Sequence, residues 1–219
     1  MTATVYLLLA VTLCGLAFWV WSRRSPLHNA AHGALVASLV GLFLAAASTL
    51  MILVAQWGLT GDVLAHAQRM LGLAAQHLSM PLIGLAALFL ARGLAWNPSI
   101  WGKIILGGMA FFELSRYLDV QQAYHWLVNM TGLGALLIAG LLNSKEDRRV
   151  LILCLVAVAS VLAPALIHPG LPLAGLYTAT HHASWLIPGF VASGLAVGLL
   201  AEQAHNSTIS LDQNLTNNP

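Results

Sequence analysis

The chain contains seven apolar segments, each long enough to form a helix that crosses a membrane. An α-helix needs about 20 mostly apolar residues to cross a hydrocarbon core that is ~30 Å thick. The breaks between the segments are polar or carry proline and glycine, which interrupt helices. The sequence therefore predicts an all-α fold, a polytopic integral membrane bundle of seven transmembrane helices. The predicted spans cover residues 3–21, 31–56, 74–94, 101–119, 124–142, 150–167 and 174–201.

The composition supports a membrane protein. Hydrophobic residues make up 59% of the chain and charged residues only 7%. Soluble domains carry about 25% charged residues, so this chain has too few charges to cover a soluble surface. Most of its surface is expected to face membrane lipid. The formal net charge of +2 is too small to suggest nucleic acid as a partner.

The distribution of lysine and arginine predicts the orientation of the bundle, because cytoplasmic loops carry an excess of these residues. Only Arg69 and Arg116 fall on one side of the predicted spans. The other side is therefore expected to be cytoplasmic, which places the N-terminus outside and the C-terminus inside. The basic residues on this expected cytoplasmic side are Arg23, Arg24, Arg92, Lys103, Lys145, Arg148 and Arg149.

This orientation gives the domain organisation and the location that we expect. Residues 1–201 form a seven-helix transmembrane domain, in what we take to be a bacterial inner (plasma) membrane. Residues 202–219 form a polar cytoplasmic tail without apolar periodicity, which predicts disorder. The segment 61–76, just before the third span, mixes apolar and polar residues at helical spacing. It either lies along the membrane interface or extends the third span outward.

Ionisable residues gather in the outer half of the predicted bundle. The fourth span adds Glu113, Arg116 and Asp119 at this end. Residues that are far apart in sequence therefore reach one membrane depth, which predicts a site near the outer face. Six of the nine histidines belong to this group: His66, His77, His125, His168, His181 and His182.

The fourth span carries acid, base and acid on one helix face. Glu113, Arg116 and Asp119 follow one another at i,i+3 spacing. A charge inside a membrane costs a few kcal/mol even on generous insertion scales, so such residues are usually paired and face the bundle interior. One interpretation is a structural ion-pair ladder. The other makes these residues catalytic, with Glu113 or Asp119 as metal ligand or proton acceptor and Arg116 holding an anionic group.

Two further spans contribute histidines with neighbours on the same helix face. His77 and Met80 are i,i+3 in the third span, next to Pro81. His125 and Asn129 are i,i+4 in the fifth span. Gly132 lies one turn beyond Asn129 and would allow a close helix contact.

The last span offers the adjacent residues His181 and His182. Neighbours on a helix diverge by about 100°, so only one of them is expected to face the bundle interior. Its available partners are His77, His125, Glu113 and Asp119. On the inner side His28 and His32 are i,i+4, either at a solvated helix start or in a second metal or haem site.

These residues predict a transition-metal site with His77, His125, His181 and His182 as the candidate ligands. Neutral imidazoles bind zinc, copper or iron, and two histidines on facing helices could instead hold haem b. The favoured function is an integral membrane metalloprotein with redox or hydrolytic chemistry on a lipid-like or quinone-like substrate. The alternatives are a metal-free, proton-linked transporter or channel, and a structural subunit of a larger membrane protein complex.

Overall fold

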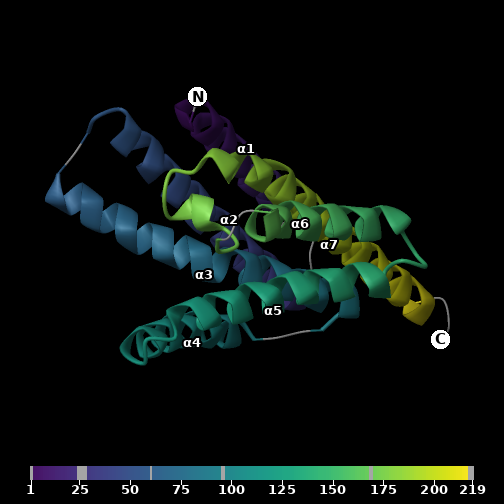
Figure 1. Ribbon diagram of the computed structural model, residues 1–219. Helices are drawn as coiled ribbons and strands as arrows, with labels where there is room; N and C mark the ends of the chain where they lie inside the picture. Colours follow the sequence, from purple (N-terminus) through teal and green to yellow (C-terminus); the bar gives the residue numbers. More distant parts are fainter. Residues whose placement is uncertain (1, 24–28, 60, 95–96, 168–169, 217–219) are drawn as a thin grey trace.

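The computed structural model describes residues 2–23, 29–59, 61–94, 97–167 and 170–216, and within these ranges it is all-helical (Figure 1). Two short 3-10 helices, η1 (Ala174–Leu176) and η2 (His181–Trp185), precede the last long helix. The long helices are α1 (Thr2–Ser22), α2 (Asn29–Gln56), α3 (Asp62–Arg92), α4 (Pro98–Tyr117), α5 (Gln121–Leu142), α6 (Arg148–Ile167) and α7 (Leu186–Thr216).

Six of these helices are long and apolar enough to cross a membrane, namely α1, α2, α3, α5, α6 and α7. This property fits an integral membrane protein. The fourth predicted span does form a helix, α4, but it does not reach the same apolarity, since Lys103, Glu113 and Arg116 lie within it.

Three helix boundaries bear on the predicted spans. The first decides between the two interpretations of segment 61–76, and the other two differ from the prediction. Helix α3 begins at Asp62, so the segment 61–76 extends the third span. Helix α7 continues to Thr216, so the tail is helical over this range although the sequence predicted disorder. At the other end of α7, residues 174–185 form η1, η2 and turns, so the seventh long helix begins only at Leu186.

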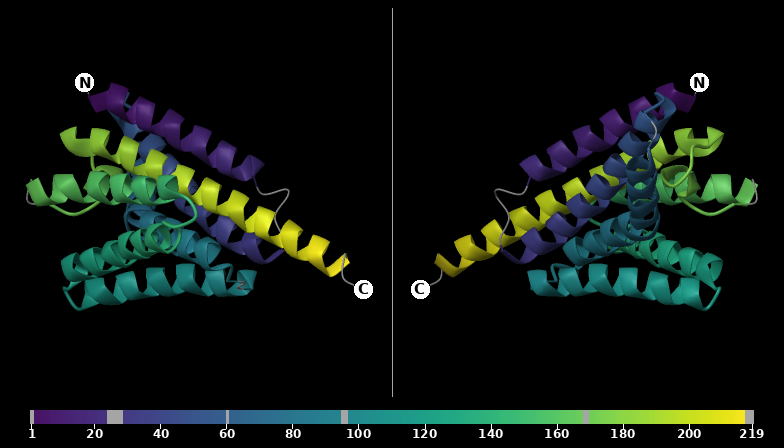
Figure 2. Two further views of the ribbon diagram at one scale, coloured as in Figure 1. Left: turned by 90° about the vertical axis from the view of Figure 1, so that its right-hand side faces the viewer. Right: turned by 90° about the vertical axis from the view of Figure 1, so that its left-hand side faces the viewer.

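Helix α3 lies at the centre of the bundle, between α2, α5 and α7, and α4 packs at the edge against α2, α3 and α5. Figure 2 shows α1 and α7 side by side on one flank and α4 with α5 on the other. The backbones of α3 and α5 touch at two glycines. A Cβ atom on Gly84 would lie 1.9 Å from the carbonyl oxygen of Gly132. The close contact that the sequence predicted at Gly132 is thus confirmed.

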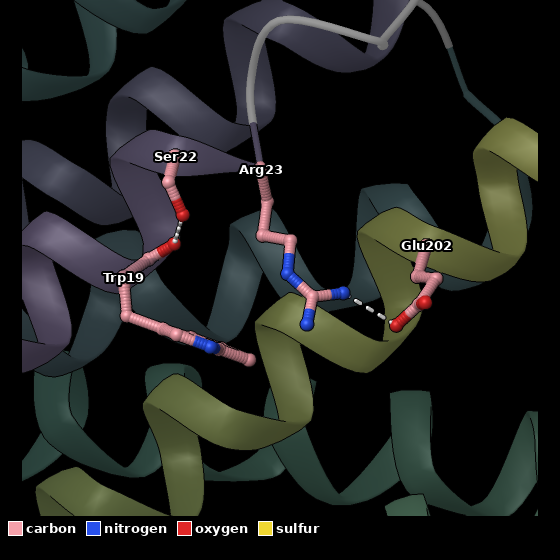
Figure 3. Close-up of polar contacts among 4 residues, drawn as sticks. All are labelled: Trp19, Ser22, Arg23 and Glu202. Atoms are coloured by element: carbon pink, nitrogen blue, oxygen red, sulfur yellow. Dashed lines mark hydrogen bonds and ion pairs between the residues drawn. The ribbon is translucent and has the colours of Figure 1, made fainter.

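Polar contacts fix α1 to the rest of the bundle at both of its ends. Near its start, the buried Tyr6 hydroxyl lies 2.8 Å from the carbonyl oxygen of Gly175 and accepts a hydrogen bond from the Thr180 N–H at 3.1 Å. Just beyond its other end, Arg23 Nη1 lies 2.6 Å from Glu202 Oε2 on α7, and its guanidinium lies over the Trp19 ring (Figure 3). The segment before α7 therefore belongs to the same end of the bundle as the start of α1.

Candidate functional site

A cavity of about 760 Å³ opens at this end of the bundle, between α3, the end of α4, the start of α5 and the chain around residues 170–178. Polar side chains from three long helices line it together with apolar ones. Those that matter for its chemistry are Arg69, Gln76, His77, Arg116, Asp119 and His125. Four of the seven residues that the sequence placed in a site are therefore brought to one cavity.

His77 and His125 are in direct contact in the wall of this cavity. His77 Nε2 on α3 lies 3.3 Å from His125 Nδ1 on α5, and the ring planes are nearly perpendicular at 85°. Both side chains are almost completely buried, with 4% and 1% of their surface exposed. The pair joins two helices that are separated by 48 residues in sequence.

In each imidazole, the nitrogen that does not face the other ring lies close to a backbone carbonyl oxygen. His77 Nδ1 lies 2.8 Å from the carbonyl oxygen of Leu73, one turn earlier in α3. His125 Nε2 lies 2.6 Å from the carbonyl oxygen of Pro172, in the segment before η1. A carbonyl oxygen can only accept, so each of these nitrogens must carry a hydrogen.

Aromatic rings and one amide hold the pair in place. The ring of His77 packs against Phe112 on α4, with centroids 4.4 Å apart, and stacks on Tyr124 at 5.8 Å. Asn129 is fully buried one turn after His125. Its Nδ2 donates to the carbonyl oxygens of Gln76 at 3.1 Å and of His125 at 3.0 Å, so it joins α5 to α3 beside the pair.

The charged residues of α4 lie at the rim of the cavity. Arg116 and Asp119 line it, whereas Glu113 lines an adjoining cavity of about 450 Å³ between α3 and α4. Arg116 Nε is 3.5 Å from Glu113 Oε2, with both side chains more than half exposed. Asp119 follows the end of α4 with a left-handed backbone (φ 57°), and it makes no ion pair with a described residue. Of the two ion pairs in the predicted ladder, only the one between Glu113 and Arg116 forms among the described residues.

The remaining histidines lie away from the pair or outside the described residues. His181 is exposed on η2, and His182 is half-buried in an adjoining cavity of about 260 Å³ beside Val161 and Pro164 of α6. This cavity shares Gly170, Leu171 and Ala174 with that of the pair. Because residues 181–185 form a 3-10 helix ahead of α7, these two side chains do not line the cavity of His77 and His125. His66 is exposed at the cavity between α3 and α4. His28 and His168 lie outside the residues that the structure describes.

Among the described residues, no group of three or more His, Cys, Asp or Glu side chains is placed to hold a metal ion. The four-histidine set that the sequence suggested is therefore not assembled there, and the structure brings together only its members His77 and His125. Met80, which shares a helix face with His77 by its i,i+3 spacing, is buried in the apolar core and does not line the cavity.

Three groups of this site were not predicted as site residues. Arg69 and Gln76 are seven residues apart on α3, a spacing that places them on one helix face, but Gln76 and His77 are neighbours that diverge by about 100°, so the helical pattern did not group them with His77. The third is the carbonyl group of Pro172. No local pattern marks it, because its place depends on how the chain after α6 folds back over α5.

The fold defines this chain as a helical-bundle protein with six helices long and apolar enough to cross a membrane, and with a histidine-containing cavity at one end. No known protein family, no curated protein and no solved structure matches the sequence.

Proposed function

We propose that this protein is an integral membrane protein that binds a transition-metal ion between His77 and His125, in a cavity at the outer face of a bacterial inner membrane. The excess of lysine and arginine on the opposite side supports this orientation. The single observation that carries the proposal is the contact between His77 Nε2 and His125 Nδ1.

The hydrogen bonds of the two rings leave their facing nitrogens without hydrogens. A neutral imidazole has one N–H group and one lone pair. The single N–H of each ring is used by a carbonyl oxygen, that of Leu73 or of Pro172. Two lone pairs therefore face each other at 3.3 Å, which is repulsive unless a cation lies between them. Metal-binding histidines usually show this arrangement, in which the second ring N–H donates to a carbonyl or carboxylate oxygen.

The nitrogen–nitrogen distance fits two ligands of one tetrahedral ion. With metal–nitrogen distances of 2.0–2.1 Å, two such ligands lie about 3.3 Å apart. A proton shared by the pair would satisfy both lone pairs too, but a charge-assisted hydrogen bond usually brings its heavy atoms to about 2.7–2.9 Å. Axial ligands of one haem lie on opposite faces of the macrocycle, and two rings with centroids 4.9 Å apart leave no room for it. The geometry therefore favours zinc over haem b.

With only two protein ligands, the ion would have open positions toward the cavity. A zinc ion with an open position binds a water molecule or polarises an oxygen atom of a ligand. This chemistry suits hydrolysis of a lipid-like substrate, and Arg116 and Asp119 at the rim would contact such a substrate. A transport pathway has less support, because the residues beyond the pair, such as Leu82, Ile83 and Leu136, form a buried apolar core.

Metal analysis of the protein purified in detergent tests this proposal. We expect about one zinc ion per chain in the wild type, and loss of the metal in both His77→Gln and His125→Gln. Substitution of cobalt for zinc should give the visible spectrum of a tetrahedral ion with nitrogen ligands. His182→Gln is the matched control, since its side chain lies in another cavity, and it should retain the metal.

Two results would overturn the metal site. One is a well-folded wild-type protein that takes up neither zinc nor cobalt. The other is a nitrogen NMR spectrum showing a hydrogen shared between His77 and His125 in metal-free protein that zinc does not displace.

A further inference from the structure

We infer that the histidine cavity receives the anionic head of a membrane lipid, whose acyl chains leave the protein sideways between α3 and α4. This inference deepens the proposed function, because it concerns the ligand of the same cavity and rests on that cavity being the functional site. It is carried by other residues, however, and can fail or hold independently of the metal.

The cavity continues sideways between two helices. The 760 Å³ cavity of the histidine pair and the 450 Å³ cavity between α3 and α4 share the side chains of Arg69, Leu73, Phe112 and Arg116. Figure 1 shows α3 and α4 separating toward the first residues of α3 and the last residues of α4. The shared residues belong to the first half of α3 and the last two turns of α4. A ligand can therefore occupy both cavities as one continuous space.

The sideways branch is lined by four apolar residues and by five polar ones, which are His66, Arg69, Glu113, Arg116 and Gln121. Met70 and Leu73 of α3 face Met109 and Phe112 of α4 across it. Met70 is 50% exposed. On the outer surface of α4, Leu106 and Phe111 are exposed, as expected for side chains that contact lipid. The apolar side of this branch, formed by the four apolar lining residues, can take hydrocarbon chains, and its polar residues can face a head group.

Two arginines stand at the junction of the branch with the histidine cavity. Arg69 makes no ion pair within the described part of the chain, and Arg116 has one, through Nε, to Glu113. A guanidinium group has five N–H donors and binds the oxygens of a phosphate in a bidentate way. Glu113 and Asp119 balance the formal charge of the two arginines, but most of the guanidinium donors are left for an oxyanion.

An anionic phosphate head fits this junction better than a neutral quinone ring does. A quinone carbonyl accepts one or two hydrogen bonds, whereas a phosphodiester offers several oxygens and a negative charge. The apolar side of the branch, with Met70 and Met109, then holds the acyl chains. The expected ligand is therefore a phospholipid with a net negative head group.

Lipid binding to the full-length protein in detergent, followed by native mass spectrometry, tests the inference. The probes are phosphatidylglycerol and phosphatidylcholine with identical acyl chains, and glycerol 3-phosphate as the head without chains. We expect phosphatidylglycerol to bind roughly tenfold more tightly than phosphatidylcholine, and glycerol 3-phosphate to bind far more weakly than either lipid. Both lipids carry the same phosphodiester, so the tenfold factor is the effect expected from the choline cation, which lies close to the phosphate and is repelled by the two arginines.

Arginine variants assign the binding to this cavity. Arg69→Gln and Arg116→Gln should each weaken phosphatidylglycerol binding roughly tenfold, and Arg69→Lys should restore part of it, since lysine keeps the charge but loses the bidentate geometry. Arg92→Gln, at the opposite end of α3, is the matched control and should have no effect. The metal content of Arg69→Gln should equal that of the wild type, which separates this inference from the metal site.

Equal affinity for the two lipids would overturn the inference, and so would wild-type affinity in both arginine-to-glutamine variants. Binding of glycerol 3-phosphate as tight as that of the lipid would show a site for free anions instead. Loss of the metal in His77→Gln with phosphatidylglycerol binding retained would support both proposals. A wild-type protein that takes up no zinc but still binds the lipid through Arg69 and Arg116 would refute only the metal site.

Discussion

Gly84 and Gly132 meet backbone to backbone, each seven residues after a histidine of the pair. Gly84 follows His77 on α3, and Gly132 follows His125 on α5. Seven residues are two helical turns, and α3 and α5 run in the same direction through the bundle. The glycine contact therefore sets the register in which the two imidazoles face each other. Small residues at such a contact are the usual means of bringing membrane helices close together.

Gly132→Ala tests this relationship. The new Cβ atom would lie 2.6 Å from the Pro81 nitrogen and 2.7 Å from the Met80 carbonyl carbon, which are backbone atoms that cannot move away on their own. We expect the helices to separate, the free energy of unfolding to fall by about 1–3 kcal/mol, and the metal affinity to fall with it. Thermal unfolding in detergent and metal analysis measure the two effects.

Gly134→Ala is the control on the same helix, because a Cβ atom there would meet no other atom within 4 Å. The greater helix propensity of alanine should leave its stability unchanged or raise it by up to about 1 kcal/mol. If Gly132→Ala matched the stability and metal content of Gly134→Ala, the glycine contact would have no role in the register.

Tyr6→Phe tests the attachment of the segment that supports His125. The change removes the acceptor of the Thr180 N–H and the hydroxyl beside the carbonyl oxygen of Gly175. A buried polar group left without its partner costs about 1–3 kcal/mol. We expect the amides of residues 174–180 to exchange hydrogen faster, because this segment loses its link to α1.

Hydrogen exchange read by mass spectrometry checks this expectation, with Tyr117→Phe as the control. Tyr117 is 87% exposed, so its hydroxyl should contribute less than about 0.5 kcal/mol. Unchanged exchange across 174–180 in Tyr6→Phe would mean that the segment is held by its other contacts.

Glu202→Gln addresses the opposite end of the bundle. The ion pair with Arg23 is short at 2.6 Å, but the two side chains are 50% and 36% exposed. Exposed ion pairs contribute about 0–1 kcal/mol, and salt screens them. We expect a decrease in stability of less than about 1 kcal/mol at low salt, a smaller one at high salt, and no change in metal content or lipid binding. A larger, salt-independent loss would show that this contact matters far more than its exposure suggests.

Helix positions were largely predictable from the sequence, whereas the site was predictable only in part. Every predicted span corresponds to a long helix, and the close approach at Gly132 followed from its small size and its spacing from His125. The sequence named His77 and His125 as residues that the fold could bring together, and the structure places them in contact. The separation of His182 from them was not predictable, because it depends on residues 174–185 folding as turns and 3-10 helices before α7.

By itself, the sequence determined the helical segments and their apolar character, because length and apolarity act locally along the chain. It also determined that histidines and arginines would be available at one end of the bundle. Only the tertiary structure decided which of them meet. The contact of His77 with His125 depends on the register of α3 against α5 and on a carbonyl group supplied by the chain at Pro172. Side chains that are 48 residues apart meet through the packing of whole helices, and no local pattern encodes that packing.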